Sequence, residues 1–180
     1  VETIEGQMGG AFFPISTASF RSSVKFVGLQ EETFDVFGAT VSTLFVVHPG
    51  RTLAYRVDFE GHSIVYVPDN EITPQCVEPE LTGEALRLAR FAEGASLLLH
   101  DCQYSREGYE AHRGWGHSCG DLLAAVVARA GVDRVLLFHH DPDHPDETID
   151  AIHAEFQSAL KRHGGKALSD PAREGLTYLT

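Results

Sequence analysis

The chain has 180 residues, of which 43% are hydrophobic, and a formal net charge of −12. This length suits one domain, which we expect over residues 1–180 with an irregular N-terminal segment over residues 1–23. The acidity argues against extensive binding to a nucleic-acid backbone, which needs clustered Lys and Arg. The acidity does not exclude a phosphate ester bound at a metal ion, because the metal supplies positive charge locally. We find no membrane-length apolar run, no signal peptide and no disulfide framework, and therefore expect a cytoplasmic protein.

The first part of the chain has the composition of β-strands. Runs rich in Val, Phe, Tyr and Ile are separated by Gly or Pro, which predicts strands. The expected strands are residues 24–29, 40–47, 53–60 and 63–67. A tight hairpin turn at residues 60–62 should join the last two.

The second part alternates between helical and strand patterns. Apolar residues at helical spacing end near Gly94 and again near Gly131, two favourable helix stops. Ser118 is the expected N-cap of the second helix, and Pro145 marks the start of a third helix. The expected elements are a helix over 81–92, a strand over 96–99, a helix from 118 to 131, a strand over 134–138, a helix from 145 with Ile149, Ile152, Phe156 and Leu160 as its buried stripe, and a strand over 175–179.

Three of the strand-like runs are followed directly by a potential metal ligand. His48, Asp69 and His139 each come just after an apolar run. Strand ends can hold imidazole and carboxylate groups rigidly toward one cleft. A buried carboxylate is also costly unless it is hydrogen-bonded or bound to a cation. Taken singly, each residue could be an ordinary polar strand end; together they favour metal binding.

Several segments in this order resemble the metallo-β-lactamase superfamily, most of all its ribonuclease Z and small phosphodiesterase branches. The resemblance is carried by residues 48–56, 63–69, 97–101, 116–118, 135–142 and 172–175. It implies a metallo-hydrolase-like α+β domain, an αββα sandwich in an N-terminally incomplete version. It also implies two adjacent divalent metal ions, usually zinc, with manganese or iron as alternatives.

The resemblance implies a role for each candidate residue. His48 would bind one metal and His139 the other, and Asp69 would bridge both. The metals would activate a water molecule to attack a phosphodiester. His117 would lie beside the scissile phosphate and donate a proton or hydrogen bond. Asp101 would orient active-site histidines. The predicted catalytic residues are therefore His117 and Asp69.

Some alternatives stay open at this point. His140 should point away from the site if the strand continues through it, yet a shift of one residue would exchange it with His139. His100 could be a residue behind the ligands or simply a buried, hydrogen-bonded histidine. His144 is a weaker candidate. Cys119, two residues after His117, is a minor candidate for a nucleophile.

One part of the expected pattern is missing. The upstream His-x-His-x-Asp-His cluster of the resembled family is absent, and residues 1–47 contain no histidine. The chain could be a fragment, a shortened member that uses other ligands, or a non-catalytic remnant; we favour the fragment. The leading hypothesis is a metal-dependent phosphodiester hydrolase. The alternative is a non-catalytic half-domain for binding or dimerisation, with a homo-oligomer or a complementing N-terminal segment as partner.

Overall fold

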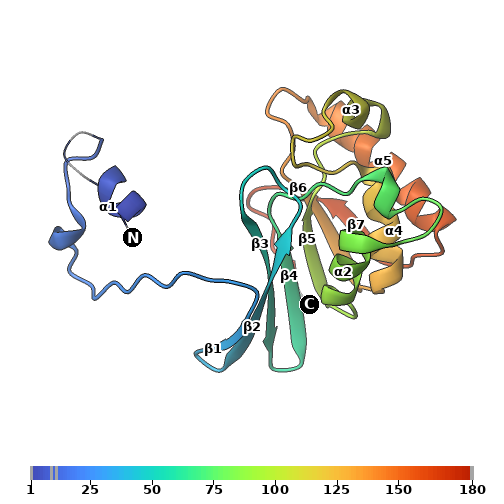
Figure 1. Cartoon of the computed structure of the whole chain (residues 1–180). Coiled ribbons are helices and arrows are strands. Elements are labelled where there is room, and N and C mark those ends of the chain that lie inside the picture. Colours follow the sequence, from blue (N-terminus) through green and yellow to red (C-terminus); the bar gives the residue numbers. More distant parts are fainter. Residues whose placement is uncertain (1, 9, 11, 179–180) are drawn as a thin grey trace.

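The computed structural model describes residues 2–8, 10 and 12–178. The N-terminal stretch contains α1 (Glu2–Gln7) and the short helix η1 (Thr17–Ser19) and leads away from the sheet (Figure 1). The strand predicted over residues 24–29 is wrong: these residues form no strand, and Val24 and Val27 are 48% and 64% exposed. No strand among the described residues pairs with this segment, so a favourable composition alone does not produce a strand.

Seven strands form one sheet and are arranged in chain order. They are β1 (Thr33–Val36), β2 (Ala39–Val46), β3 (Thr52–Phe59), β4 (His62–Val67), β5 (Leu97–Asp101), β6 (Arg134–Phe138) and β7 (Leu168–Pro171). The pairs from β1 to β4 are antiparallel, and those from β4 to β7 are parallel. The predicted hairpin is confirmed, because Glu60 and Gly61 both have positive φ, at 49° and 83°, as a two-residue turn requires.

The two outer strands were not predicted. The strand expected over 175–179 is wrong for residues 175–178, which form none, and Leu179 lies outside the described residues. Instead β7 forms earlier and pairs with β6 through register partners such as Leu136 and Asp170. Its Ser169, Asp170 and Pro171 weaken the strand signal. An edge strand tolerates these residues because one side of its backbone needs no partner.

The helices cover one face of the sheet (Figure 1). The main ones are α2 (Gly83–Phe91), α4 (Gly120–Ala130) and α5 (Asp146–Arg162), with α3 (Arg106–Ala111) and η2 (Pro74–Cys76) in the connections. Gly131 ends α4 in a left-handed conformation, as predicted. Ile152, Phe156 and Leu160 of the predicted α5 stripe are buried, and Ile149 partly so. No helix in the described part of the chain is long and apolar enough to cross a membrane.

The two faces of the sheet differ in burial. Val65 and Val67 of β4 are fully buried under the helices, whereas Ile64 and Tyr66 on the opposite face are 40% and 41% exposed. This alternation is the strand period of two. The mixed α and β fold is confirmed. The described residues form one sheet and one helical layer, which correspond to one half of the expected four-layer sandwich.

Candidate metal centre

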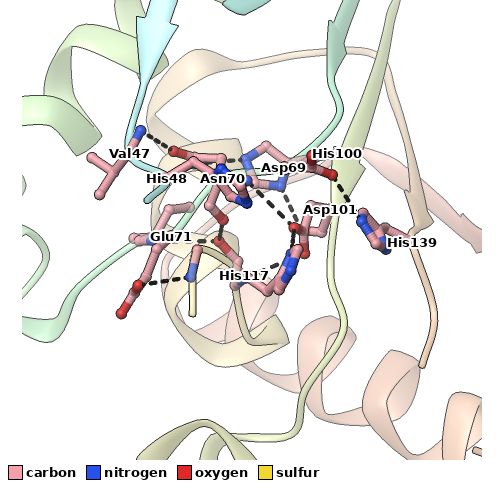
Figure 2. A network of polar contacts seen from close by, with 12 residues as sticks. Val47, His48, Asp69, Asn70, Glu71, His100, Asp101, His117 and His139 are labelled. Atoms are coloured by element: carbon pink, nitrogen blue, oxygen red, sulfur yellow. Dashed lines mark hydrogen bonds and ion pairs between the residues drawn. The ribbon is translucent and has the colours of Figure 1, made fainter. Parts of the chain in front are cut away.

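The candidate ligands gather at one edge of the sheet. Because β4, β5 and β6 are parallel, their carboxyl ends meet at this edge, where loops carry polar side chains. Asp69 follows β4, Asp101 ends β5 and His139 follows β6, while His117 comes from the loop before α4 (Figure 2). One potential ligand atom from each of these four residues lies within 4.8 Å of the others. This group could hold a metal ion.

Asp69 and His139 form the accessible pair of the group. Asp69 Oδ1 lies 2.8 Å from His139 Nε2, and their side chains are 33% and 36% exposed. His139 has a φ of 59°, in the left-handed region that side chains other than glycine rarely adopt. This backbone breaks the alternation of β6 and brings the imidazole of His139 to Asp69. Such strain is often found at functional sites.

Asp101 and His117 form the buried pair. Asp101 is fully buried, and its Oδ2 accepts hydrogen bonds from Nδ1 of His117 at 2.5 Å and from the backbone N–H of Asn70 at 3.3 Å. Its Oδ1 accepts from the backbone N–H of Ser118 at 3.3 Å. The hydrogen bond to Asp101 raises the pKa of His117 above its usual value. Both oxygens of Asp101 are thus occupied, which suits a residue that orients His117 better than a metal ligand.

A second buried network lies behind these pairs. His100 is fully buried; its Nδ1–H donates to the backbone oxygen of Asp101 at 2.6 Å, and its Nε2 accepts from the Asn70 amide at 3.2 Å. Burial lowers the pKa of His100, which therefore stays neutral and serves as a hydrogen-bonded core residue. Asn70 Oδ1 also accepts from the backbone N–H of Val47 at 3.0 Å, so this network ties the end of β2 to β4 and β5.

Ser118 has a different role from the predicted one. The N-cap of α4 is Cys119, and Ser118 does not cap the helix. Instead the Ser118 hydroxyl donates to the backbone oxygen of Asn70 at 2.6 Å and accepts from the backbone N–H of Ile72 at 3.1 Å. The N-cap prediction is wrong because this long-range partner competes successfully for the hydroxyl.

His48 lies near the group but outside it. Its ring centroid is 5.8 Å from that of His117 (Figure 2), and its Nδ1 accepts a hydrogen bond from the Gly50 N–H at 3.1 Å. Gly116 packs directly against this ring, because a Cβ on Gly116 would overlap with the imidazole. The structure thus brings Asp69, His117 and His139 together and places His48 beside them.

Sequence reasoning missed Glu71 and Asn70. Glu71 is 7% exposed and accepts hydrogen bonds from Tyr109 and from the backbone of Gly114 and Gly116. The only available signal was a pair of polar residues directly after Asp69. Their partners lie up to 48 positions away, where no local pattern reveals them.

The remaining alternatives fall outside the group. Both ring nitrogens of His140 are buried and have no hydrogen-bond partner among the described residues, and His140 is not part of the cluster. His144 is also outside the cluster. Cys119 is fully buried, and burial raises the pKa of its thiol to about 11. A nucleophile needs a thiolate, so this value argues against that role.

Comparison with curated proteins finds relatives for part of the chain. No protein-family model matches it. A ribonuclease Z from Ignicoccus hospitalis is 33% identical over 102 residues, which cover 56% of this chain and 31% of the relative. A ribonuclease Z from Thermoplasma volcanium is 30% identical over 102 residues, or 56% of this chain and 30% of the relative. The matched region thus spans less than a third of the length of these relatives.

Comparison with solved structures concerns the fold. The metallo-β-lactamase fold protein YhfI from Bacillus subtilis superposes with a TM-score of 0.64 at 18% identity, over 88% of this chain and 57% of that one. A diphosphatase from the PhnP family superposes with a TM-score of 0.53 at 17% identity, over 82% of this chain and 46% of that one. At such identities the likeness shows a shared fold.

Proposed function

We propose that the chain is a metal-dependent hydrolase of phosphodiesters, because it is similar in sequence to part of ribonuclease Z proteins and in fold to metallo-β-lactamase fold proteins. The observation that carries the proposal is the juxtaposition of two histidine–aspartate pairs, Asp101 with His117 and Asp69 with His139, at one sheet edge. The names of the ribonuclease Z relatives support phosphodiesters as the substrate class. Fold alone would support many other reactions.

The donor set fits divalent metal ions. Imidazole nitrogens and carboxylate oxygens are ligands that zinc, manganese and iron accept. Asp69 Oδ1 contacts His139 Nε2 and both side chains are partly exposed, which leaves lone pairs on Asp69 Oδ2 and on His139 Nδ1 for a cation. We propose two ions, one on His48 and one on His139, with Asp69 bridging them. Bound there, they would supply a hydroxide near neutral pH and stabilise charge on the phosphate.

His48 needs a local change to take this role. Its Nδ1 accepts a hydrogen bond from Gly50, so the neutral ring carries its proton on Nε2. A metal bound at Nε2 requires the proton on Nδ1 instead, and the Gly50 contact must then be released. Nδ1 could alternatively bind the metal itself after the same release. Either way, metal binding should change the environment of the Gly50 amide.

His117 is the proposed proton donor. Its Nδ1 bonds to Asp101 (Figure 2). Nε2 has no hydrogen bond to another described residue and would be the atom that faces a substrate. The raised pKa keeps the imidazolium form populated to higher pH than for a free histidine. A protonated Nε2 could then donate to a phosphate oxygen or to the leaving group. Asp69 would act through its position between the ions.

The substrate class can be narrowed by charge. The chain carries 26 acidic against 14 basic residues, which argues against a long contact with a nucleic-acid backbone. The ribonuclease Z relatives weigh against excluding nucleic acid altogether. We therefore propose recognition of a phosphodiester at the metal site, with few contacts beyond it, and regard a short RNA as a substrate to test beside small phosphodiesters.

The test combines metal analysis with a substrate assay. Elemental analysis of the natively purified chain should find about two zinc, manganese or iron ions per chain. The loaded protein should hydrolyse bis(p-nitrophenyl) phosphate, and His117→Ala should lower kcat/KM at least about 100-fold. His163→Ala, an exposed histidine at the end of α5, serves as control. Full metal loading without any phosphodiester hydrolysis would refute the proposed function; unchanged turnover in His117→Ala would refute the role of His117.

A second candidate function is association through the open face of the sheet. Ile64 and Tyr66 are 40% and 41% exposed there, and the Tyr66 ring lies 5.4 Å from that of Phe138. An apolar sheet face of this kind favours a partner sheet. We propose a second copy of the chain, packed face to face. Light scattering should show a mass that doubles with concentration and returns to the monomer in Tyr66→Lys; a well-folded monomer at all concentrations would exclude this function.

A further inference from the structure

Glu71 is a buried carboxylate whose donors all come from one segment, residues 109–116. Its Oε1 accepts from the Tyr109 hydroxyl at 2.8 Å and from the Gly114 N–H at 2.9 Å, and its Oε2 accepts from the Gly116 N–H at 3.1 Å. The residue is 7% exposed. A buried carboxylate must be hydrogen-bonded, and bonds to a charged acceptor are stronger than neutral ones. Glu71 therefore holds this segment firmly.

The held segment leads directly into His117. Gly114 and Gly116 have φ values of 83° and 94°, a conformation that favours glycine and turns both N–H groups toward Glu71. Trp115, between them, is 60% exposed, and its ring contacts that of His112, whereas both bonds to Glu71 come from the backbone of the loop. The next residue is His117, whose ring is bonded to Asp101.

Glu71 also connects this loop to the strand that leads to His48. Its backbone N–H donates to the oxygen of Val47 at 2.7 Å, one residue before His48. Gly116 packs against the His48 ring, where a Cβ would overlap with it. Glu71 thus spans the two loops that carry His48 and His117 (Figure 2), and it lies two residues after Asp69.

We infer that Glu71 is a positioning residue, which clamps the loop Gly114–Gly116 and thereby sets the orientation of His117 beside Asp69 and His139. Its carboxylate bonds to Tyr109, Gly114 and Gly116 and is not part of the candidate ligand group. Its effect on turnover rests on the proposed function, whereas its effect on the loop and on the His117 ring does not. The two can therefore be tested separately.

The chain offers a direct probe of the loop. Trp115 is the only tryptophan in the sequence, so tryptophan fluorescence reports on this loop alone. Glu71→Gln keeps the size of the side chain but replaces one acceptor oxygen by an NH2 group that cannot accept an N–H. We expect acrylamide to quench Trp115 about twofold more efficiently, because the loop opens locally. The Nδ1 proton of His117, followed by NMR, should broaden or shift as its hydrogen bond to Asp101 loosens.

Glu93→Gln is the matched control. Glu93 is an exposed carboxylate that pairs with Arg129, outside residues 109–116. Both signals should stay as in the wild type. Tyr109→Phe removes one of the three donors and should shift both signals in the same direction by less; it decides the matter if Glu71→Gln does not fold. Unchanged quenching together with an unchanged His117 proton in folded Glu71→Gln would overturn the inference.

The activity of the metal-loaded protein tests the consequence. With bis(p-nitrophenyl) phosphate, Glu71→Gln should lower kcat about 10- to 100-fold and change KM less than about threefold, as expected for a residue that orients a catalytic group. Loss of stability alone would lower the amount of folded protein but not kcat per folded molecule. If the wild type hydrolyses no phosphodiester, the proposed function fails while the fluorescence and NMR measurements still decide the role of Glu71.

Discussion

Two aspartates at the ends of neighbouring strands, Asp69 and Asp101, have opposite surroundings. Asp101 is fully buried, and its two oxygens accept three hydrogen bonds. Asp69 is 33% exposed and contacts His139. A carboxylate that is withdrawn from water must be saturated by donors, and it then holds those donors in place. A carboxylate left half-exposed keeps lone pairs for a cation. The same side chain thus positions in one case and can bind in the other.

The largest loss of stability should follow from replacing the buried aspartate, Asp101. Asp101→Ala leaves the ring of His117 and the backbone N–H groups of Asn70 and Ser118 without their acceptor, and each unsatisfied buried donor costs roughly 1–3 kcal/mol. We expect the free energy of unfolding to fall by about 4 kcal/mol, measured by urea denaturation of the metal-free protein. Asp101→Asn, which keeps one acceptor oxygen, should lose about half as much. A loss below about 1 kcal/mol in Asp101→Ala would contradict the positioning role.

Replacing the half-exposed aspartate, Asp69, should affect metal binding much more than stability. Asp69→Asn should leave the free energy of unfolding of the metal-free protein within about 1 kcal/mol, because the side chain is partly solvated. The affinity for zinc should fall at least about 100-fold, since a neutral amide is a far weaker ligand than a bridging carboxylate. Competition with a chromophoric chelator measures this affinity. Asp133→Asn, an exposed aspartate at the opposite end of β6, should change neither quantity.

The contrast also explains which site residues the sequence could predict. Asp69, His117 and His139 follow recognisable apolar runs or a family-like segment, and the structure brings all three together. Their binding of metal stays a prediction. Glu71 was missed because its partners Gly114 and Gly116 lie 43 and 45 positions away. Long-range backbone donors leave no local signal, so residues that position others are the harder ones to find.

The same distinction holds for the fold. The central strands β4, β5 and β6 were predicted because each contains an apolar run that packs at least one face against the helices. The edge strands β1 and β7 were missed, and residues 24–29 were wrongly assigned. Segments at the edge of a sheet are half-exposed and therefore carry fewer apolar residues than central strands do. Whether such a segment forms a strand depends on pairing with a strand that is distant in the sequence. Val27 shows this, since a β-favouring residue without a partner strand stays 64% exposed.

A pair of glycines can separate backbone strain from contact with His48. Gly114 and Gly116 have similar φ values of 83° and 94°, and both N–H groups bond to Glu71. A Cβ on Gly114 meets nothing within 4 Å, whereas one on Gly116 would overlap with the ring of His48. We expect Gly114→Ala to lower the free energy of unfolding by about 1 kcal/mol, which is backbone strain alone. Gly116→Ala should lose about 2 kcal/mol more through the overlap.

The same pair extends the comparison to metal binding. Gly116→Ala should also weaken metal binding through the displaced His48, and Gly114→Ala should not. Zinc titration of both variants measures this difference. Equal losses of stability and equal zinc affinities in the two variants would show that His48 can move freely away from Gly116. His48 would then not contribute to metal binding together with the other site residues.

Glu155 of α5 is a partly buried carboxylate and therefore lies between the buried Asp101 and the half-exposed Asp69. Its Oε1 accepts one hydrogen bond, from the Arg106 N–H at 2.8 Å. Burial raises the pKa of this carboxyl, and the nearby Asp121 adds to the effect, while the hydrogen bond from Arg106 opposes it. The folded state therefore holds its proton to higher pH than the unfolded state. Glu155 contributes stability below its unfolded pKa, and this contribution is lost as the pH rises through the folded value.

Glu155→Gln removes this titration but keeps an oxygen to accept the Arg106 N–H. We expect the variant to be more stable than the wild type by about 0.5 kcal/mol at pH 7, after allowance for solvent screening, with no gain at pH 4. Urea denaturation at both pH values measures the difference. A gain of equal size at pH 4 would mean that packing, and not the charge, limits Glu155. A loss at pH 7 would mean that the ionised carboxyl of Glu155 is fully compensated, and that partial burial by itself does not separate the two kinds of carboxylate.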